Sequence, residues 1–150
     1  MTEVLFREAV RADLPAVLAL LADDVLGTAR DLAEVDEAYE RAFADITADP
    51  RNQQVVAERD GEIVGCCQLT YIPGLGRHGV ERALVEAVRV RSDLRGQGLG
   101  RAMMTWAIDQ ARARGCGLVQ LTTDKSRADA HRFYRGLGFT ASHEGMKLTL

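Results

Sequence analysis

Apolar residues in the first third of the chain recur at two spacings. Residues 4–9 are typical of an opening strand, and Asp13 is placed to cap the helix that follows. The apolar positions of that helix recur every three or four residues: Leu14, Val17, Leu18, Leu21 and Val25. A second helix is predicted over residues 36–48, because Pro50 ends it.

The middle of the chain carries strand-like runs. Residues 54–59 and 62–72 flank Asp60-Gly61, a dipeptide that suits a tight hairpin turn because both residues tolerate positive φ. An irregular loop occupies residues 73–76, and a long strand is predicted from about residue 82 to residue 91.

A glycine-rich loop comes next, and the pattern then alternates between helix and strand. The first helix carries apolar residues that we assign to core packing and ends at Gly115: Leu99, Met103, Trp106 and Ala107. A buried strand is predicted at residues 118–122. Ser126 and Asp129 resemble a capping box before a helix over residues 130–136. Phe139 and residues 146–150 are assigned to two last short strands. The pattern predicts one domain over residues 1–150, with a mixed sheet and helices on its faces.

The loop at residues 95–100 carries the strongest chemical signal. Its three alternate glycines stand between a strand and a helix, where they allow positive φ and close approach of a ligand to the backbone. The helix directs its unpaired N–H groups and the positive end of its dipole into the loop, which favours a phosphate or pyrophosphate. The alternative is a merely tight turn from strand to helix.

Two common phosphate motifs do not fit this loop. A Walker loop needs Gly-x-x-x-x-Gly-Lys-Ser/Thr, which the chain lacks. The dinucleotide fingerprint Gly-x-Gly-x-x-Gly/Ala fails in both frames, because Arg101 and Met103 stand where the third small residue belongs. The sequence therefore argues against a nucleoside triphosphate and against a dinucleotide.

The pattern Arg/Gln-x-x-Gly-x-Gly/Ala does fit, with Arg95, Gly98 and Gly100. A strand at residues 85–90 precedes it, and residues 130–139 follow with the spacing Ala-x-x-x-Tyr-x-x-x-Gly-Phe. With these motifs the chain resembles the GNAT superfamily of acetyl-CoA-dependent N-acetyltransferases over nearly its whole length. The resemblance implies an α/β (α+β) fold: a mixed, mostly antiparallel central sheet with helices on both faces.

The resemblance implies a cofactor-binding role for the loop. Its backbone amides would hold the pyrophosphate of acetyl-CoA, which maps to Arg95, Gly96, Gln97, Gly98, Gly100 and Arg101. The pantetheine arm would pair with the main chain of the preceding strand, at Val88 and Val90. That strand is expected to separate from its neighbour near residues 118–122. Arg127 departs from the family, since many relatives carry an asparagine there. It is assigned to a cofactor phosphate or to solvent.

Two residues are candidates for catalysis under the same resemblance. Tyr134 matches the family tyrosine near the cofactor sulfur, and a phenol can protonate a departing thiolate; the alternative is an aromatic anchor for the last helix. Glu86 stands where many relatives place a carboxylate that accepts the proton of the amine; the alternative is a salt bridge with Arg89. His78 is a weaker candidate for the base.

Composition limits the partners. The chain has 150 residues and a net charge of −3, which argues against nucleic acid as a partner. The N-terminus lacks the pattern of a targeting segment, and no apolar run is long enough to span a membrane, so a cytoplasmic location is predicted. The three cysteines form no Cys-x-x-Cys pair, so no metal site is predicted and they are assigned to apolar packing. A homodimer is possible, because the terminal strands offer edges that could pair.

The predicted function is acetyl transfer from acetyl-CoA to a primary amine by direct attack in a ternary complex. The alternatives are a non-catalytic acyl-CoA-binding sensor or interaction module on the same fold, a regulator that binds nucleic acid or protein, and a covalent acetyl-cysteine mechanism. The acceptor amine is left open. Acidic residues in the first third would suit a cationic amine: Asp23, Asp24, Glu34, Asp36 and Glu37.

Overall fold

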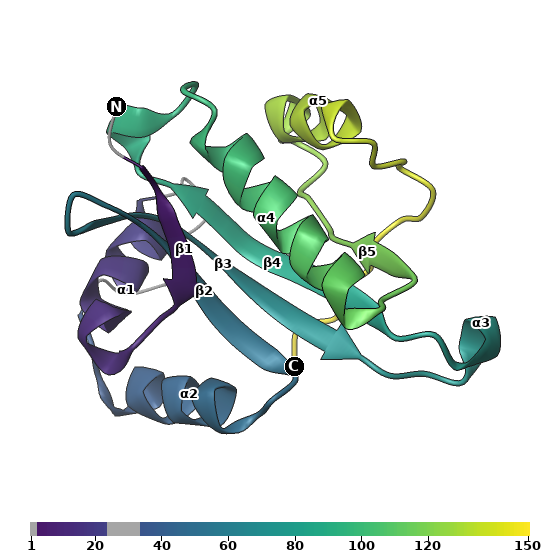
Figure 1. The fold of residues 1–150 in the computed structure, drawn as a ribbon, viewed down its shortest axis with the longest axis horizontal. Helices are drawn as coiled ribbons and strands as arrows, with labels where there is room; N and C mark the ends of the chain where they lie inside the picture. The colour runs from purple at the N-terminus through teal and green to yellow at the C-terminus, as the bar shows by residue number, and fades with distance from the viewer. Residues whose placement is uncertain (1–2, 24–33) are drawn as a thin grey trace. The chain divides into compact units, whose positions relative to one another are not determined.

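The computed structural model describes residues 3–23 and 34–150 (Figure 1). The chain forms two compact units, residues 1–120 and 121–150. Asp24 and Val25, assigned above to an acidic surface and to the first helix, lie outside the described residues. Within these residues, no helix is both long and apolar enough to cross a membrane.

The first unit contains a five-stranded sheet in the order β1-β2-β3-β4-β5. Its strands are β1 (Leu5–Glu8), β2 (Asn52–Arg59), β3 (Glu62–Ile72), β4 (Arg82–Val90) and β5 (Leu118–Gln120). The first four strands pair antiparallel, whereas β5 pairs parallel with β4. The predicted mixed, mostly antiparallel sheet is confirmed.

The turn between β2 and β3 has the predicted geometry. Asp60 has a φ of 54° and Gly61 a φ of 77°, so both central residues are left-handed. This conformation matches the right-handed twist of the two strands that the turn joins.

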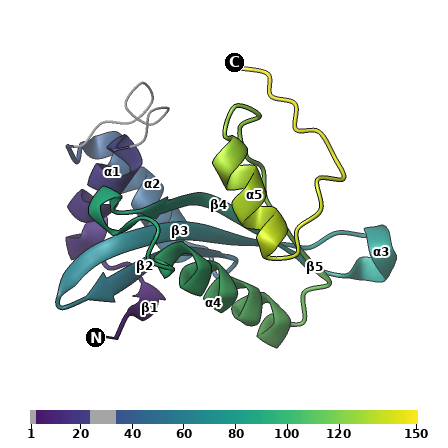
Figure 2. The same cartoon turned by 90° about the horizontal axis from the view of Figure 1, so that it is seen from above.

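Helices cover the two faces of the sheet because neighbouring strand residues point to opposite sides. On one face, Val56 and Cys66 pack against Val17 and Leu20 of α1 (Leu14–Ala22). On the other face, the core contains Tyr71, Ala83 and Ala111, the last from α4 (Leu99–Arg114). Figure 2 shows α1 and α4 on opposite sides of the sheet, as the sequence predicted.

The long helix α4 packs as its apolar residues indicate. Met103 and Met104 are fully buried, and Ala107 is 1% exposed. The half-buried ring of Trp106 lies against Phe6 of β1, with 5.8 Å between the ring centroids. The assignment of the methionines and the tryptophan to packing is therefore confirmed.

The start of each of the first two helices involves an aspartate, but the cap predicted at Asp13 is wrong. Asp36 precedes α2 (Glu37–Ala48) and accepts a hydrogen bond from the N–H of Tyr39. Asp13, which ends a short 3-10 turn at Arg11–Asp13 (η1), does not cap α1. Its carboxylate instead accepts from Arg7 and from the N–H of Val10. A nearby guanidinium binds a carboxylate more strongly than a neutral amide does, so this arrangement is favoured.

The loop after β3 contains one short turn, α3 (Gly76–Gly79). Arg77 and His78 have φ values of 54° and 62° there, which are left-handed rather than helical angles. The sequence correctly predicted an irregular connection in this region.

The second unit contains α5 (Ala128–Gly136), and two predictions about this unit are wrong. Ser126 does not cap the helix, because its hydroxyl and its N–H both donate to the carboxylate of Asp124. Residues 139–150 form no strand among the described residues, although their apolar positions alternate. Alternation favours an extended chain, but a strand also needs a neighbouring backbone for its hydrogen bonds.

We expect Asp13→Asn to lower the free energy of unfolding at pH 7 by about 1–3 kcal/mol, because the side chain is nearly buried against Arg7. Arg7 holds the pKa of Asp13 below its ordinary value of 3.8. This contribution is therefore present above about pH 4 and disappears as the pH falls through the lower pKa of the folded state. Urea unfolding of both proteins at about pH 7 and about pH 3 measures the difference.

Glu40→Gln is the matched control for this prediction. It breaks the ion pair of Glu40 with Arg11, in which both side chains are more than 40% exposed. We expect a change of less than about 0.5 kcal/mol. An Asp13→Asn effect of the same size at both pH values would contradict the assignment to the ion pair.

Candidate active site

The segment between β4 and α4 is exposed at its centre and anchored at both ends. Leu94, at the end of a 3-10 turn at Ser92–Leu94 (η3), and Leu99, the first residue of α4, are each 8% exposed. Residues 95–98 between them are all exposed. Gly96 has a φ of 79° and Gly98 a φ of 85°, in the left-handed region that favours glycine. The two glycines let the chain turn from strand to helix with its backbone open to a ligand.

The N-terminus of α4 is not capped by a side chain. Gly98 occupies the N-cap position, and its carbonyl accepts from the N–H of Ala102 at 3.0 Å. The N–H groups of Leu99, Gly100 and Arg101 come before this first intrahelical bond, so they point out of the end of the helix. Together with the helix dipole, they favour an anion such as a phosphate.

Two arginines add positive charge to the loop. Arg95 and Arg101 are exposed, and neither forms a salt bridge within residues 3–23 and 34–150. Arg95 Nε donates to the carbonyl of Val90 at 3.3 Å, which keeps its side chain beside β4. Arg91, by contrast, is engaged by Asp93 and Glu62. The unneutralised charge therefore lies where the α4 amides are open.

A bulge interrupts β4 shortly before the loop. Gln68 pairs with Glu86 and Cys66 with Arg89, so the two residues Ala87 and Val88 lie opposite the single residue Cys67. Ala87 has a φ of 51°, which costs a residue with a Cβ about 1–2 kcal/mol. This bulge could not be predicted from the sequence, because glycine, not alanine, is the usual residue at such a position.

Beyond its first residues, β4 separates from β5. The two strands pair only at Arg82, Ala83 and Leu84. The N–H of Arg91 donates to Val64 of β3, so the alternation of an antiparallel pair directs the backbone groups of Val88 and Val90 to the opposite edge. The separation expected from the sequence is therefore present, and it leaves main-chain groups of β4 without a strand partner on that edge.

Glu86 lies on β4 next to the bulge, and its side chain is exposed. It forms no hydrogen bond or ion pair with any residue that the structure describes, so the salt bridge with Arg89 is absent. Arg89 Nη1 donates to the carbonyl of Val88 at 3.0 Å instead. A carboxylate in this position is available to a substrate.

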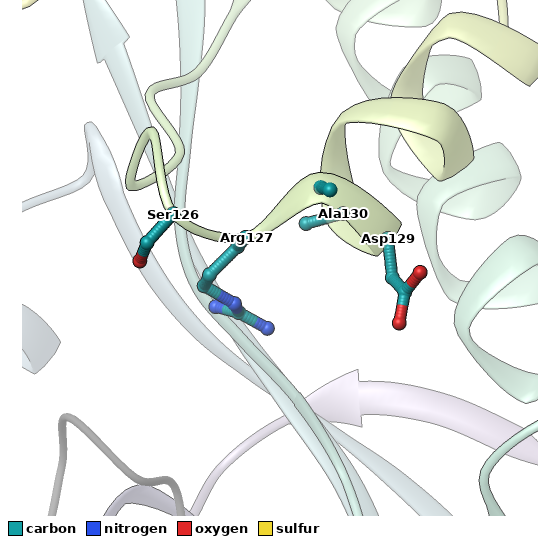
Figure 3. A pocket seen from close by; sticks show the side chains of 5 residues that line it. Ser126, Arg127, Asp129 and Ala130 are labelled. Atoms are coloured by element: carbon teal, nitrogen blue, oxygen red, sulfur yellow. The ribbon is translucent and has the colours of Figure 1, made fainter.

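The other two candidate residues belong to the second unit. Arg127 occupies the N-cap position of α5, and Figure 3 shows it beside Ser126, Asp129 and Ala130 around a hollow at the start of that helix. Tyr134 is half-buried, and its ring contacts Phe133 and Phe139 edge-on, with centroid distances of 5.1 Å and 5.8 Å. These contacts hold the ring in one orientation within its own unit.

The cysteines and His78 offer little chemistry. Cys66 and Cys67 are fully buried, and burial raises the pKa of each thiol to about 12. Burial and the nearby Glu81 carboxylate also raise the pKa of Cys116. The assignment of Cys66 and Cys67 to apolar packing is confirmed, while His78 lies exposed in the turn α3.

Comparison with known families supplies the class of protein. A profile of the acetyltransferase (GNAT) family matches residues 15–139, which is most of the chain. The chain therefore belongs to the GNAT family of acetyltransferases.

Curated relatives agree on the reaction. The chain is 33% identical to the aminoalkylphosphonate N-acetyltransferase of Salmonella typhimurium over 138 residues, which cover 91% of this chain and 85% of the relative. It is 32% identical to the L-methionine sulfoximine/L-methionine sulfone acetyltransferase of Pseudomonas aeruginosa, over 91% of this chain and 80% of that protein. The protein is an enzyme, an acetyl-CoA-dependent N-acetyltransferase, and a non-catalytic module is not favoured.

Solved structures agree on the fold. A protein of Bacillus halodurans C-125, described as a transcriptional regulator, is 49% identical to this chain with a TM-score of 0.96, over 99% of this chain and all of the other. An acetyltransferase of Trypanosoma brucei is 27% identical with a TM-score of 0.81, over 99% and 100% of the two chains.

We expect Gly98→Ala to weaken coenzyme A binding at least about tenfold. A Cβ at Gly98 would meet no atom within 4 Å, so the change acts through the backbone: the residue leaves its φ of 85° and turns the loop amides away. Isothermal titration calorimetry with coenzyme A measures the effect.

Gly115→Ala is the matched control, at the other end of the same helix. Gly115 has a φ of 88° and equally free space for a Cβ, so the strain is similar. We expect both variants to lose about 1–2 kcal/mol of stability. Only Gly98→Ala should change the affinity, and equal affinities in the two variants would refute a ligand role for the loop.

Proposed function

We propose that this N-acetyltransferase takes its acetyl group from acetyl-CoA and transfers it to a primary amine by direct attack within a ternary complex. The observation that carries this proposal is the uncapped start of α4 beside the open edge of β4. The start of α4 suits the phosphates of coenzyme A, and the open edge of β4 suits its pantetheine arm, which carries amides.

The first unit offers groups that fit acetyl-CoA. The loop amides and arginine charges suit the pyrophosphate, and the residues involved are Arg95, Gly96, Gln97, Gly98, Gly100 and Arg101. The backbone of Val88 and Val90 suits the amides of the pantetheine arm, which would add to β4 like a further strand. Arg127, in the second unit, is assigned to a phosphate of the same molecule.

Two side chains are assigned to the proton transfers of the reaction. When bound, acetyl-CoA supplies a thioester whose acyl carbon is open to attack. The amine must first lose a proton, because a lysine-like amine has a pKa of about 10.4. Glu86 accepts this proton, directly or through a water molecule, and the hydroxyl of Tyr134 donates a proton or a hydrogen bond to the departing thiolate.

Positioning contributes more to this reaction than proton transfer. Holding two reactants in the correct geometry lowers a barrier by roughly 7–11 kcal/mol, whereas general acid–base catalysis contributes about 10²–10⁴-fold, or about 3–5 kcal/mol. We therefore assign the larger part of the rate to the loop and to the edge of β4.

The buried thiols favour direct attack over an acetyl-cysteine intermediate. With pKa values of about 12 and no exposed surface, Cys66 and Cys67 are rarely thiolates at neutral pH and lie out of reach of a substrate. Mass spectrometry after incubation with acetyl-CoA alone should detect no acetylated cysteine.

The acceptor we propose is a cationic amine. Asp23, Glu34, Asp36 and Glu37 give the chain exposed acidic positions on either side of the segment at 24–33. Asp36 is partly engaged as the cap of α2, and Glu37 approaches Arg41 at 3.9 Å. The named substrates of the Salmonella and Pseudomonas relatives also carry amines.

Nucleic acid and membranes stay outside the proposal. The net charge of −3 gives no general attraction to a polyanion, and we propose a cytoplasmic location. A gel-shift assay at stated salt would test whether this enzyme shares the role described for the Bacillus halodurans protein.

We also propose a homodimer formed through the C-terminal segment. Met146, Leu148 and Leu150 alternate with polar residues and are 94%, 85% and 111% exposed. β5 is the last strand of the sheet, so one of its edges has no strand partner among the described residues. The alternating C-terminal segment of one copy could pair with the open edge of β5 in a second copy, and the second copy could do the same in return.

For the catalytic pair, we expect Glu86→Gln to lower kcat/KM at pH 7 about 10²-fold without changing the affinity for acetyl-CoA. Raising the pH toward 10 should recover much of the loss, because the amine is then deprotonated by the solvent. Tyr134→Phe should lower kcat with no such recovery. Thiol release from acetyl-CoA across a pH series measures both.

Glu62→Gln is the control, because Glu62 is an exposed carboxylate on the neighbouring strand that pairs with Arg91. This variant should leave the dependence of kcat/KM on pH unchanged. A Glu86→Gln enzyme with wild-type turnover across the series would remove Glu86 from the mechanism.

For the dimer, we expect Leu148→Lys to yield a monomer, because a charged side chain in the pairing segment opposes its burial. Light scattering after size exclusion measures the mass of both proteins. Leu75→Lys is the control, since Leu75 is 98% exposed in a loop without an apolar pattern. A wild-type monomer at about 100 μM would end this proposal.

A further inference from the structure

Five polar side chains gather on one face of the sheet, which we call the polar row. They come from three adjacent strands: Asn52 and Gln54 of β2, Gln68 and Thr70 of β3, and Glu86 of β4. Gln54 lies opposite Gln68, and Gln68 lies opposite Glu86. Val56 and Cys66 continue this face under α1, so the row occupies positions that would otherwise be apolar core.

The orientation of the Asn52 side-chain amide is fixed by a carboxylate, which can only accept hydrogen bonds. Its Nδ2 donates to the carboxylate of Asp49 at 2.9 Å, which leaves Oδ1 as an acceptor. That oxygen accepts from Thr70 Oγ1 at 2.8 Å and from Gln68 Nε2 at 3.5 Å. The hydroxyl of Thr70, one N–H of Asn52 and one N–H of Gln68 are therefore engaged by protein acceptors.

The same reasoning applies to Gln54, whose Nε2 donates to the carbonyl of Cys67 at 3.2 Å. Three acceptors remain: Oε1 of Gln54, Oε1 of Gln68 and the carboxylate of Glu86. None of them forms a hydrogen bond with any residue in the ranges that the structure describes. The row thus presents three acceptor groups, next to the second N–H of each of its amides, and a ligand that binds the acceptors must carry donors.

The strands set the spacing of these acceptors. Neighbouring strands lie about 4.8 Å apart, so Gln68 stands about 5 Å from Glu86 and Gln54 about 10 Å from it. If the nitrogen of a ligand gives its proton to Glu86, a second donor on the same ligand, about 5 Å from that nitrogen, would reach Gln68.

We infer that the polar row binds the acceptor substrate, and that this substrate is an amine with a second N–H or O–H donor about 5 Å from its reacting nitrogen. Diamines and amino sugars share this chemistry. The inference depends on the proposed function, because it places the reacting amine at Glu86. It adds Gln68 as a residue that determines specificity.

Two arginines, Arg82 and Arg89, lie on the same face as the polar row and could favour an anionic substrate instead. Arg82 lies four residues from Glu86, about 13 Å along the strand, and its Nη1 lies against Gly74, only 3.2 Å from where a Cβ on that residue would stand. Arg89 lies opposite Cys66, and its Nη1 donates to the carbonyl of Val88. The guanidinium of Arg89 thus donates to the backbone and that of Arg82 lies beside Gly74, whereas the three acceptors have no donor among the described residues.

Steady-state kinetics with three small amines tests the inference. 1,3-Diaminopropane carries a second donor, propylamine carries none, and 2-aminoethylphosphonate carries an anion. We expect kcat/KM for the diamine to exceed that for propylamine about tenfold. Gln68→Leu should remove most of this advantage by raising KM for the diamine about 3- to 10-fold, with KM for propylamine and for acetyl-CoA unchanged.

Two further variants separate specificity from structure. Gln68→Glu keeps an acceptor oxygen and should keep the preference for the diamine. Gln53→Leu changes the adjacent residue of β2 on the opposite face, where Gln53 accepts from the hydroxyl of Tyr71, and should leave the ratio unchanged.

Two results would overturn the inference while leaving the proposed function intact. One is a preference for 2-aminoethylphosphonate, and the other is a Gln68→Leu enzyme that loses activity equally toward all three amines. No thiol release with any amine, while calorimetry still shows acetyl-CoA binding, would overturn the proposed function and this inference with it.

Discussion

The site depends on the way in which β4 is hydrogen-bonded. One edge of this strand is paired with β3 over most of its length, whereas β5 pairs with only three residues on the other edge. The first pairing makes β4 a rigid part of the sheet. The short second pairing leaves the edge at Val88 and Val90 without a strand partner, although the carbonyls of these two residues accept from the side chains of Arg89 and Arg95. A rigid backbone edge without a strand partner can recognise a ligand with little loss of its own entropy.

The bulge at Ala87 adds to this constraint. Its left-handed backbone is unfavourable for alanine, and it persists because the surrounding sheet is well packed: Cys66 and Cys67 opposite it are fully buried. The bulge increases the local twist and changes the alternation of side chains after Glu86. A carboxylate on the open face and unpaired backbone on the strand edge therefore lie within a few residues of each other.

Much of the fold could be predicted from local pattern. The hairpin at Asp60-Gly61, the helices α2 and α4 and the sheet class follow from periodicity and turn chemistry, which act over a few residues. The failures share a cause, because each depends on which partner a residue or segment finds outside its local pattern. Asp13 binds Arg7 rather than capping α1, and Ser126 binds Asp124 rather than capping α5. Residues 146–150 alternate like a strand but have no neighbouring strand among the described residues.

The sequence by itself determined the glycine loop, its likeness to a known family and therefore the acetyl donor, because backbone freedom and residue spacing are local properties. Only the tertiary structure decided which groups are open to a substrate. Pairing between strands produces the bulge, the separation of β4 from β5 and the open acceptor oxygens of Gln54 and Gln68. Such pairing depends on segments far apart in the chain, so the sequence of one segment does not determine it.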